Sequence, residues 1–239
     1  MSLNRRTFLT VGAAAAAGIA ASAAHALPVG KPEKWDSEFD IVIVGAGGAG
    51  LAAGSVAADL KLSAVVLEKE PVVGGSSTIC GGQWSVAGTD EQKKRGIEDS
   101  EELFVKDMLT TGQNKNDPAI VRAFVKESKA MYEWVTGKLG VKPVTVTLAA
   151  GKSVPRAHTF NPSQVIQALK TYDEKNGVKI MTRTAAERLI WDDEAGCIAG
   201  VRAKRGSKTM NIRAKKGVLL ATGGFSRWGG ARNPDLLSR

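Results

Sequence analysis

The chain has 239 residues, with 33 lysines and arginines against 24 aspartates and glutamates, so its formal charge at pH 7 is +9. The basic residues occur in short scattered groups without interleaved aromatic residues, which argues against a nucleic-acid-binding surface. The two cysteines, Cys80 and Cys197, are far apart and no Cys-x-x-Cys-His motif occurs, which excludes an attached c-type haem. Because there are only two histidines, a metal site such as a zinc site is not expected.

Residues 1–26 are expected to be a twin-arginine signal peptide and not part of the fold. Arg5 and Arg6 precede an alanine- and glycine-rich apolar stretch over 11–24, and an A-x-A cleavage site ends at Ala26. The stretch is short and poor in leucine and isoleucine, which argues against a stable membrane span; an uncleaved anchor or a buried helix are the alternatives. Removal of the signal takes away two arginines and no acid, leaves a charge of +7, and predicts a periplasmic protein that is exported folded with its cofactor.

Residues 39–69 carry the pattern of a strand, a glycine turn, a helix and a second strand that ends in an acid. Gly45 permits the tight turn, Gly47 has no Cβ and lets a pyrophosphate approach the backbone, and Gly50 lets the helix pack against the sheet. Free N–H groups at the helix start would bind the phosphates, and Glu68 would bind a sugar. The pattern predicts a dinucleotide site, because a glycine turn without a ligand leaves Glu68 unexplained.

A glycine- and serine-rich segment over 71–90 follows the second strand. Loops of this length usually serve a function, and the N–H groups of such a run can surround a phosphate or a flavin ring. The alternative is a flexible linker, but the apolar residues within the run argue against it.

Helical spacing of apolar residues and capping residues predict three further helices. One is expected at about 99–111, capped by Asp99 or Ser100, and a second at about 117–138, with Asp117 as N-cap. A third should start at Asn161. Apolar runs predict strands at 178–181, 188–191, 198–201, 210–212 and 217–222, of which the second to fourth form a β-meander and the last enters a second glycine turn.

Several motifs together resemble a known family. They are the glycine turn, Glu68-Lys69, Gly74-Gly75-Ser76, Gly81-Gly82 and Ala221-Thr222-Gly223-Gly224. With them the chain resembles the FAD-binding domain of the fumarate reductase/succinate dehydrogenase flavoprotein superfamily. Within it, the soluble periplasmic fumarate reductases of the flavocytochrome c type and the urocanate reductases are the most similar, and Arg156-Ala157-His158 extends the similarity beyond the glycines.

The resemblance implies an α/β fold, namely a Rossmann-like FAD-binding domain with a parallel sheet, a β-meander crossover and a helical insertion. Residues 27–38 would be a leader and 39–239 the N-terminal part of this domain, with the cap domain absent from these residues. The residues implied to bind FAD are Gly45, Ala46, Gly47, Gly48, Ala49 and Gly50 at the pyrophosphate, Glu68 and Lys69 at the ribose, Gly75, Ser76, Ser77, Gly81 and Gly82 beside the flavin, Ala186 at the adenine, and Thr222 and Gly223 over the dinucleotide.

The resemblance also implies the chemistry. Reduced flavin passes a hydride from N5 to an alkene carbon beside a carboxylate or carbonyl, and the electrons come from a cytochrome, which is expected here as a separate subunit. The segment 83–87 is bulkier than in the family, and His158 is followed by Thr159 where the family continues toward Arg-Pro. A larger enoate, such as an acrylate-like compound, is therefore at least as consistent with the chain as fumarate.

No catalytic residue is assigned, because the family's proton-donating arginine lies beyond the position where this chain stops. His158 is the one local candidate, and its alternative is a structural role. Two other hypotheses stay open. The chain could be a 3-ketosteroid dehydrogenase-like oxidoreductase, since Trp84 and Phe160 would suit a bulky apolar substrate, or a truncated, non-catalytic flavin-binding fragment.

Overall fold

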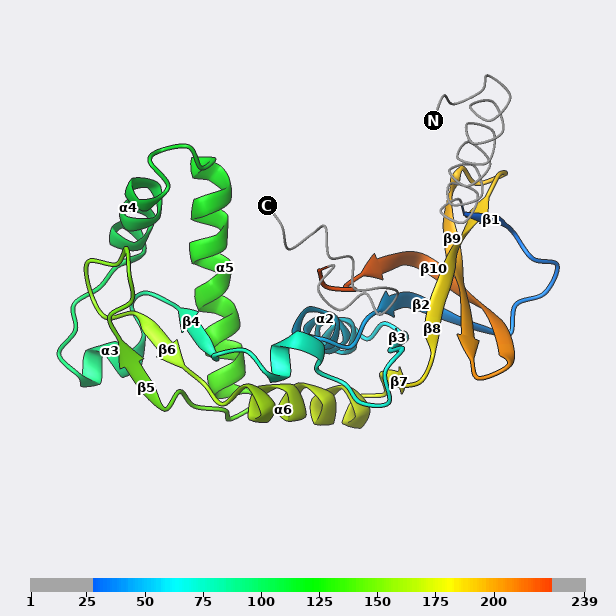
Figure 1. The fold of residues 1–239 in the computed structure, drawn as a ribbon, viewed down its shortest axis with the longest axis horizontal. Coiled ribbons are helices and arrows are strands. Elements are labelled where there is room, and N and C mark those ends of the chain that lie inside the picture. Colours follow the sequence, from blue (N-terminus) through cyan, green and yellow to red (C-terminus); the bar gives the residue numbers. More distant parts are fainter. Residues whose placement is uncertain (1–27, 225–239) are drawn as a thin grey trace, which may run out of the picture.

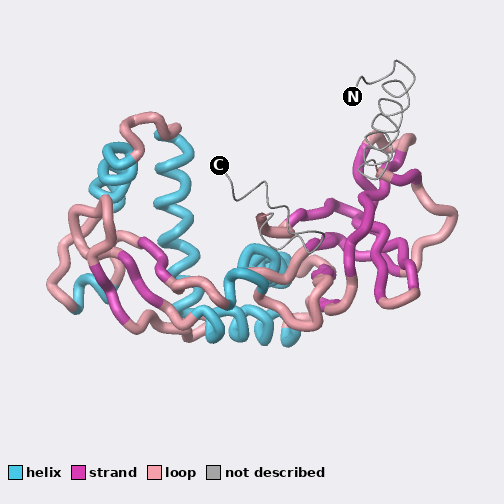
Figure 2. Tube along the Cα trace, viewed as in Figure 1, coloured by secondary structure: helices cyan, strands magenta, loops and turns pink. Residues whose placement is uncertain are grey.

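The computed structural model describes residues 28–224, and this part of the chain forms two lobes (Figure 1). The sheet lobe comprises residues 28–82 and 162–224, and the insertion lobe comprises residues 83–161. Figure 2 shows that strands dominate the far end of the sheet lobe, whereas helices dominate the insertion lobe and the middle of the molecule. The expected signal peptide lies outside the described residues. Within 28–224, no helix is long and apolar enough to cross a membrane.

Within the described residues, a mixed sheet of seven strands forms the sheet lobe. Its spatial order is β1 (Val29–Gly30), β8 (Ala185–Asp192), β9 (Cys197–Arg205), β10 (Lys208–Leu220), β2 (Ser37–Val44), β3 (Ala64–Leu67) and β7 (Lys179–Met181). β10, β2, β3 and β7 run parallel, and β8, β9 and β10 form an antiparallel meander. The predicted fold class is confirmed. β1 lies within the expected leader and pairs with β8.

The central strands are buried on both faces, which explains their unbroken apolar sequence. Ile43 and Val66 point toward the helices, where they join one core cluster with Leu51 of α2 (Gly48–Asp59) and Leu169 of α6 (Pro162–Lys175). The alternate residues of the same strands join a second cluster with the meander: Val42, Val44, Val65, Leu67, Val201, Ala203 and Ile212. The period of two along each strand thus divides the core into a helix side and a meander side.

The strands predicted at 210–212 and 217–222 are wrong as two separate elements. Both belong to β10, which runs from Lys208 to Leu220 and shifts register between Ala214 and Gly217. Before the shift, β10 pairs with β9 and β2; after it, β10 continues along β2. The bulge lets one strand end the meander and also bring the second glycine turn beside the first.

The insertion lobe contains the predicted helices and a small sheet that was not predicted. Its elements are β4 (Gln83–Ser85), α3 (Asp90–Lys94), α4 (Glu101–Thr111), α5 (Pro118–Gly137), β5 (Thr145–Thr147) and β6 (Ala157–Thr159). The Asp117 side chain caps α5 as predicted, Ser100 is the one of the two candidates that caps α4, and Asn161 caps α6. The three strands, in the order β4-β6-β5, are too short to show a period in the sequence.

A buried arginine holds the insertion lobe together. The Arg156 side chain is fully buried, and its guanidinium group donates to both carboxylate oxygens of Asp99 at 2.7 and 3.0 Å and to Asp107 at 2.7 Å. It also lies 4.7 Å from the centre of the Phe104 ring. Asp99 therefore serves as a buried ion-pair partner, and Ser100 is the helix cap.

Candidate cofactor site

The first glycine turn joins β2 to α2 at the carboxyl edge of the parallel strands. Gly45 has a φ of +104°, and a Cβ atom on it would overlap the backbone carbonyl of Ala221. A Cβ atom on Gly50 would likewise overlap the carbonyl oxygen of Gly45. Both glycines are therefore required by the close packing of the protein's own backbone.

Gly47 is different, because the protein itself has room for a side chain there. A Cβ atom on Gly47 would lie 3.9 Å from its nearest neighbours, the oxygens of Gly74 and Ser77, and the backbone φ is −77°. Gly47 is also the N-cap of α2 and makes no side-chain cap. A glycine that packing does not require, at an uncapped helix start, fits a site where a pyrophosphate approaches the backbone.

Glu68 ties the end of β3 to this turn. Its side chain is 8% exposed; Oε2 accepts a hydrogen bond of 2.9 Å from the N–H of Ala46, and Oε1 accepts one of 2.9 Å from the N–H of Glu70. Each carboxylate oxygen has a second lone pair, so the group can also accept from the hydroxyl groups of a ribose. Lys69, the next residue, is exposed.

The glycine- and serine-rich segment is held against the turn by hydrogen bonds. The N–H of Gly74 donates to the Ala46 carbonyl at 2.7 Å, and the N–H of Gly48 donates to the Ser77 hydroxyl oxygen at 3.1 Å. Gly75, Ser76 and Ser77 lie in the short 3₁₀ helix η1 (Gly75–Thr78) and thus line the turn. These contacts contradict a flexible linker at this end of the segment.

Gly81 and Gly82 lie farther along, where the chain enters the insertion lobe. A Cβ atom on Gly82 would overlap the backbone carbonyl of Phe160, and the N–H of Phe160 donates to the Gly82 carbonyl at 2.9 Å. The packing of the insertion lobe therefore accounts for Gly82. Gly81 is exposed, with open space around its Cβ position.

Two further segments complete the edge. The N–H of Thr184 donates to the Glu68 carbonyl at 2.8 Å, which places Ala186, two residues on, at the start of β8 near this acid. The N–H of Ala221 donates to the Val44 carbonyl at 2.8 Å, so the exposed Thr222 and Gly223 follow directly beside Gly45. Five chain segments thus meet at the carboxyl ends of β2, β3 and β10, where open α/β sheets bind ligands. They are the segments around residues 45, 68, 75, 184 and 222.

This edge agrees with what the sequence matches. Residues 40–238 match the family described as FAD binding domain. The chain belongs to the FAD binding domain family. FAD is therefore the cofactor, and the helix start, which has no side-chain cap from Gly47 and lies in a half-buried glycine turn, fits the diphosphate of that group.

Two curated relatives of this FAD binding domain are reductases. The chain is 35% identical to fumarate reductase (cytochrome) of Shewanella frigidimarina over 193 residues, which cover 79% of this chain and 34% of the relative. It is 33% identical to the acrylate reductase flavoprotein subunit of Shewanella woodyi over 241 residues, which cover 94% of this chain and 47% of that protein. The chain spans less than half the length of either relative.

A solved structure shares the fold. The 3-ketosteroid-Δ4-(5α)-dehydrogenase of Rhodococcus jostii RHA1 superposes with a TM-score of 0.73 at 26% identity, covering 83% of this chain and 49% of that one. The resemblance to the flavoprotein superfamily is thus confirmed by both sequence and fold.

His158, Trp84 and Phe160 do not line this edge but belong to the core of the insertion lobe. His158 is fully buried; its Nδ1 lies 2.9 Å from the Arg156 carbonyl and its Nε2 lies 2.8 Å from the Thr89 hydroxyl. Trp84 packs against Phe160 with ring centres 5.8 Å apart. The bulk of the 83–87 segment is therefore used in packing, and His158 has a structural role.

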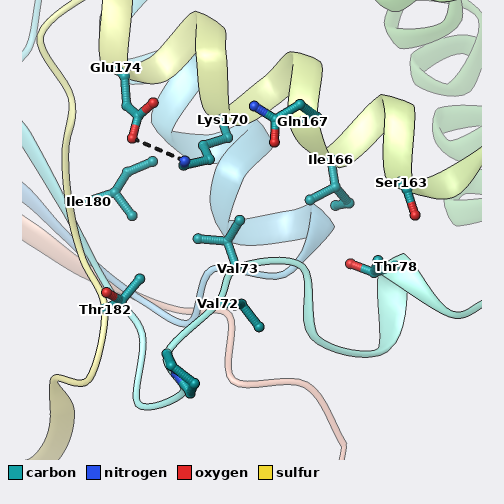
Figure 3. A pocket seen from close by; sticks show the side chains of 11 residues that line it. Val72, Val73, Thr78, Ser163, Ile166, Gln167, Lys170, Glu174, Ile180 and Thr182 are labelled. Atoms are coloured by element: carbon teal, nitrogen blue, oxygen red, sulfur yellow. Dashed lines mark ion pairs between the residues drawn. The ribbon is translucent and has the colours of Figure 1, made fainter.

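A separate groove of about 470 Å³ lies behind the glycine- and serine-rich segment (Figure 3). Val73, Ile166 and Ile180 point into it, and an ion pair of 3.6 Å between Lys170 and Glu174 crosses its rim. None of the residues predicted to bind FAD lines this groove.

Sequence reasoning missed three residues that support the edge. They are Thr184, which donates to Glu68, and Ser55 and Asp173, which join α2 to α6. In the sequence, Asp173 stands out only as an aspartate on the apolar face of an amphipathic helix, and Ser55 only as a serine within an alanine-rich helix.

Proposed function

We propose that this chain is the FAD-binding part of an exported oxidoreductase that reduces an activated C=C bond of an enoate. The observation that carries the proposal is Gly47, a glycine at an uncapped helix start that the protein's packing does not require. The similarity to the fumarate and acrylate reductases supports the reaction class.

Different segments of the chain would bind different parts of FAD. The turn over 45–50 would hold the pyrophosphate with backbone N–H groups, and Glu68 would accept from the ribose. Ser76, Ser77 and the 222–223 turn would enclose the remainder, with Ala186 at the adenine. When bound, the flavin supplies the hydride that is transferred from N5 to the substrate.

The substrate and its partners follow from charge and motifs. After export, a mature chain with a formal charge of +7 would attract a carboxylate substrate. The electron donor would be a cytochrome on a separate subunit, in line with the cytochrome in the name of the Shewanella frigidimarina relative. The twin-arginine motif supports export to the periplasm.

With His158 buried in the insertion lobe, the proton donor would come from protein outside the described residues.

The test is reconstitution of this chain with FAD, followed by turnover of the complete oxidoreductase that contains it with reduced viologen and fumarate, acrylate or urocanate. The proposal expects saturable FAD binding and oxidation of the viologen that depends on one of the enoates. A yellow protein that oxidises viologen with none of them would contradict the reductase assignment. A protein that takes up no FAD would contradict the cofactor assignment as well and favour a non-catalytic fragment.

The fold similarity to a 3-ketosteroid dehydrogenase supports one other function, dehydrogenation of a 3-ketosteroid. This alternative expects FAD-loaded protein to reduce an artificial acceptor when a 3-ketosteroid is added. The packing of Trp84 and Phe160 into the insertion lobe removes the apolar residues that favoured it in the sequence.

A further inference from the structure

A buried carboxyl group joins the two helices beneath the cofactor site. The side chain of Asp173 on α6 is 0% exposed, and its Oδ1 accepts a hydrogen bond of 2.6 Å from the hydroxyl group of Ser55 on α2. Its Oδ2 is buried and has no hydrogen-bond partner among the residues that the structure describes. The contact is so close that a Cβ atom on Gly54 would lie 2.6 Å from Oδ2.

Within residues 28–224, no cation pairs with this carboxyl group. Among the described residues, no ion pair includes Asp173, and the one charged residue of α2, Asp59, is bound to Lys138 at the end of α5. On α6, Lys170 pairs with Glu174 at 3.6 Å, and Lys175 is exposed in the last turn, as is Lys179 on β7.

These surroundings favour the neutral acid. Burial raises the pKa of Asp173 to about 7, the Glu174 charge adds to this, and the Ser55 hydrogen bond opposes it. An ionised carboxylate with one unpaired oxygen among apolar side chains is far less favourable than the protonated form.

Helix α6 supports both segments that are proposed to enclose the phosphates. α2 carries the pyrophosphate turn at its N-terminus, and α6 lies beneath α2 and η1 (Figure 1). Ile166 of α6 packs against the Gly74 backbone, at 3.2 Å from the Cβ position of that glycine. A displacement of α6 would therefore reach both segments that enclose the phosphates.

We propose that Asp173 is a positioning residue for the FAD site that works in its neutral form, and that its ionisation loosens the contact between α2 and α6 and weakens FAD binding. The inference rests on the proposed role of the glycine turn. It adds a pH dependence of FAD binding, which an aspartate that only stabilised the cofactor-free fold would not give.

The experiment measures the FAD dissociation constant of the full chain by flavin fluorescence between pH 5.5 and 8.5. In the wild type, the constant should rise at least tenfold above pH 7, and in Asp173→Asn, which is neutral at every pH, it should stay flat. Glu174→Gln removes a surface charge that raises the pKa of Asp173, so the rise in the constant should remain but begin at a somewhat lower pH than in the wild type. Equal pH dependence in wild type and Asp173→Asn, or none in the wild type, would overturn the inference.

Thermal unfolding of the FAD-free protein supplies a second readout that does not need the cofactor. Because Asp173 is neutral in the folded protein, stability should fall as the pH rises toward its pKa and level off above it. Ser55→Ala removes the hydrogen bond that favours the ionised form, so the pH at which stability levels off should move upward. An unchanged profile in this variant would also count against the inference, even if Asp173→Asn failed to fold. Absence of FAD binding at pH 6 in the wild type would contradict the proposed function itself, whereas binding without pH dependence would contradict only this inference.

Discussion

The backbone carbonyl of Ala221 lies where a Cβ atom on Gly45 would have to be. This contact joins two glycine turns that are far apart in the chain, and it forms because β10 and β2 run parallel with Leu220 opposite Val44. The first turn therefore packs directly against the backbone that follows the last described strand.

Gly45→Ala is expected to destabilise the fold. The substitution would strain a φ of +104° and push against the Ala221 backbone, with a cost of about 2 kcal/mol or more in the free energy of unfolding. Urea unfolding measures it. Gly217→Ala is the matched control, because its Cβ position is open and its φ is not in the left-handed region, and it should change stability by less than about 1 kcal/mol. Equal losses in both variants would show that the contact is unimportant.

Gly47→Ala is expected to leave the fold intact and weaken FAD binding. The protein has room for the methyl group, so the free energy of unfolding without FAD should change by less than about 1 kcal/mol. If the pyrophosphate touches this backbone, the FAD dissociation constant should rise at least tenfold, as measured by fluorescence titration. An unchanged constant would place the diphosphate elsewhere.

Glu68→Ala is expected to reduce both stability and FAD affinity. It removes the acceptor of the Ala46 and Glu70 N–H groups, and leaving a buried donor unpaired costs about 1–3 kcal/mol. Chemical denaturation and FAD titration check the two effects. Glu70→Ala serves as the control, because that side chain is exposed and the Arg183 N–H is bonded to its backbone carbonyl. A loss of stability with no loss of affinity would confine Glu68 to a structural role.

His158 is expected to make the protein less stable in mild acid. Burial lowers its pKa below the ordinary 6.5, in spite of the opposing hydrogen bond to the Arg156 carbonyl. Since the unfolded chain takes up the proton first, the free energy of unfolding should fall as pH drops below 6.5, by up to about 1.4 kcal/mol per pH unit. The difference in this free energy between the wild type and His158→Gln should accordingly shrink between pH 7.5 and 5. A difference that is constant with pH would mean that the imidazole is not held neutral.

The sequence by itself was sufficient for the elements that depend on near neighbours. The strand, glycine turn and helix over 39–59, the cap at Asp117 and the helix start at Asn161 follow from backbone freedom and from hydrogen bonds within three residues. The same rules narrowed the cap of α4 to Asp99 or Ser100, and the structure decided for Ser100. The dinucleotide site was predicted for the same reason, because the turn, helix start and acid are set by one local unit.

Only the tertiary structure decided which distant groups meet. The Ser55–Asp173 bond joins residues 118 positions apart, and Arg156 reaches Asp99 and Asp107 across the insertion lobe, contacts that leave no periodic trace in a sequence. β10 is one continuous strand because it pairs with β9 and β2 before its bulge and with β2 after it. Packing also distinguished the glycines, since a Cβ atom on Gly82 would overlap the Phe160 carbonyl, whereas a Cβ atom on Gly47 would meet no atom closer than 3.9 Å. The residue type was the same in both cases, and only its three-dimensional neighbours distinguish the two roles.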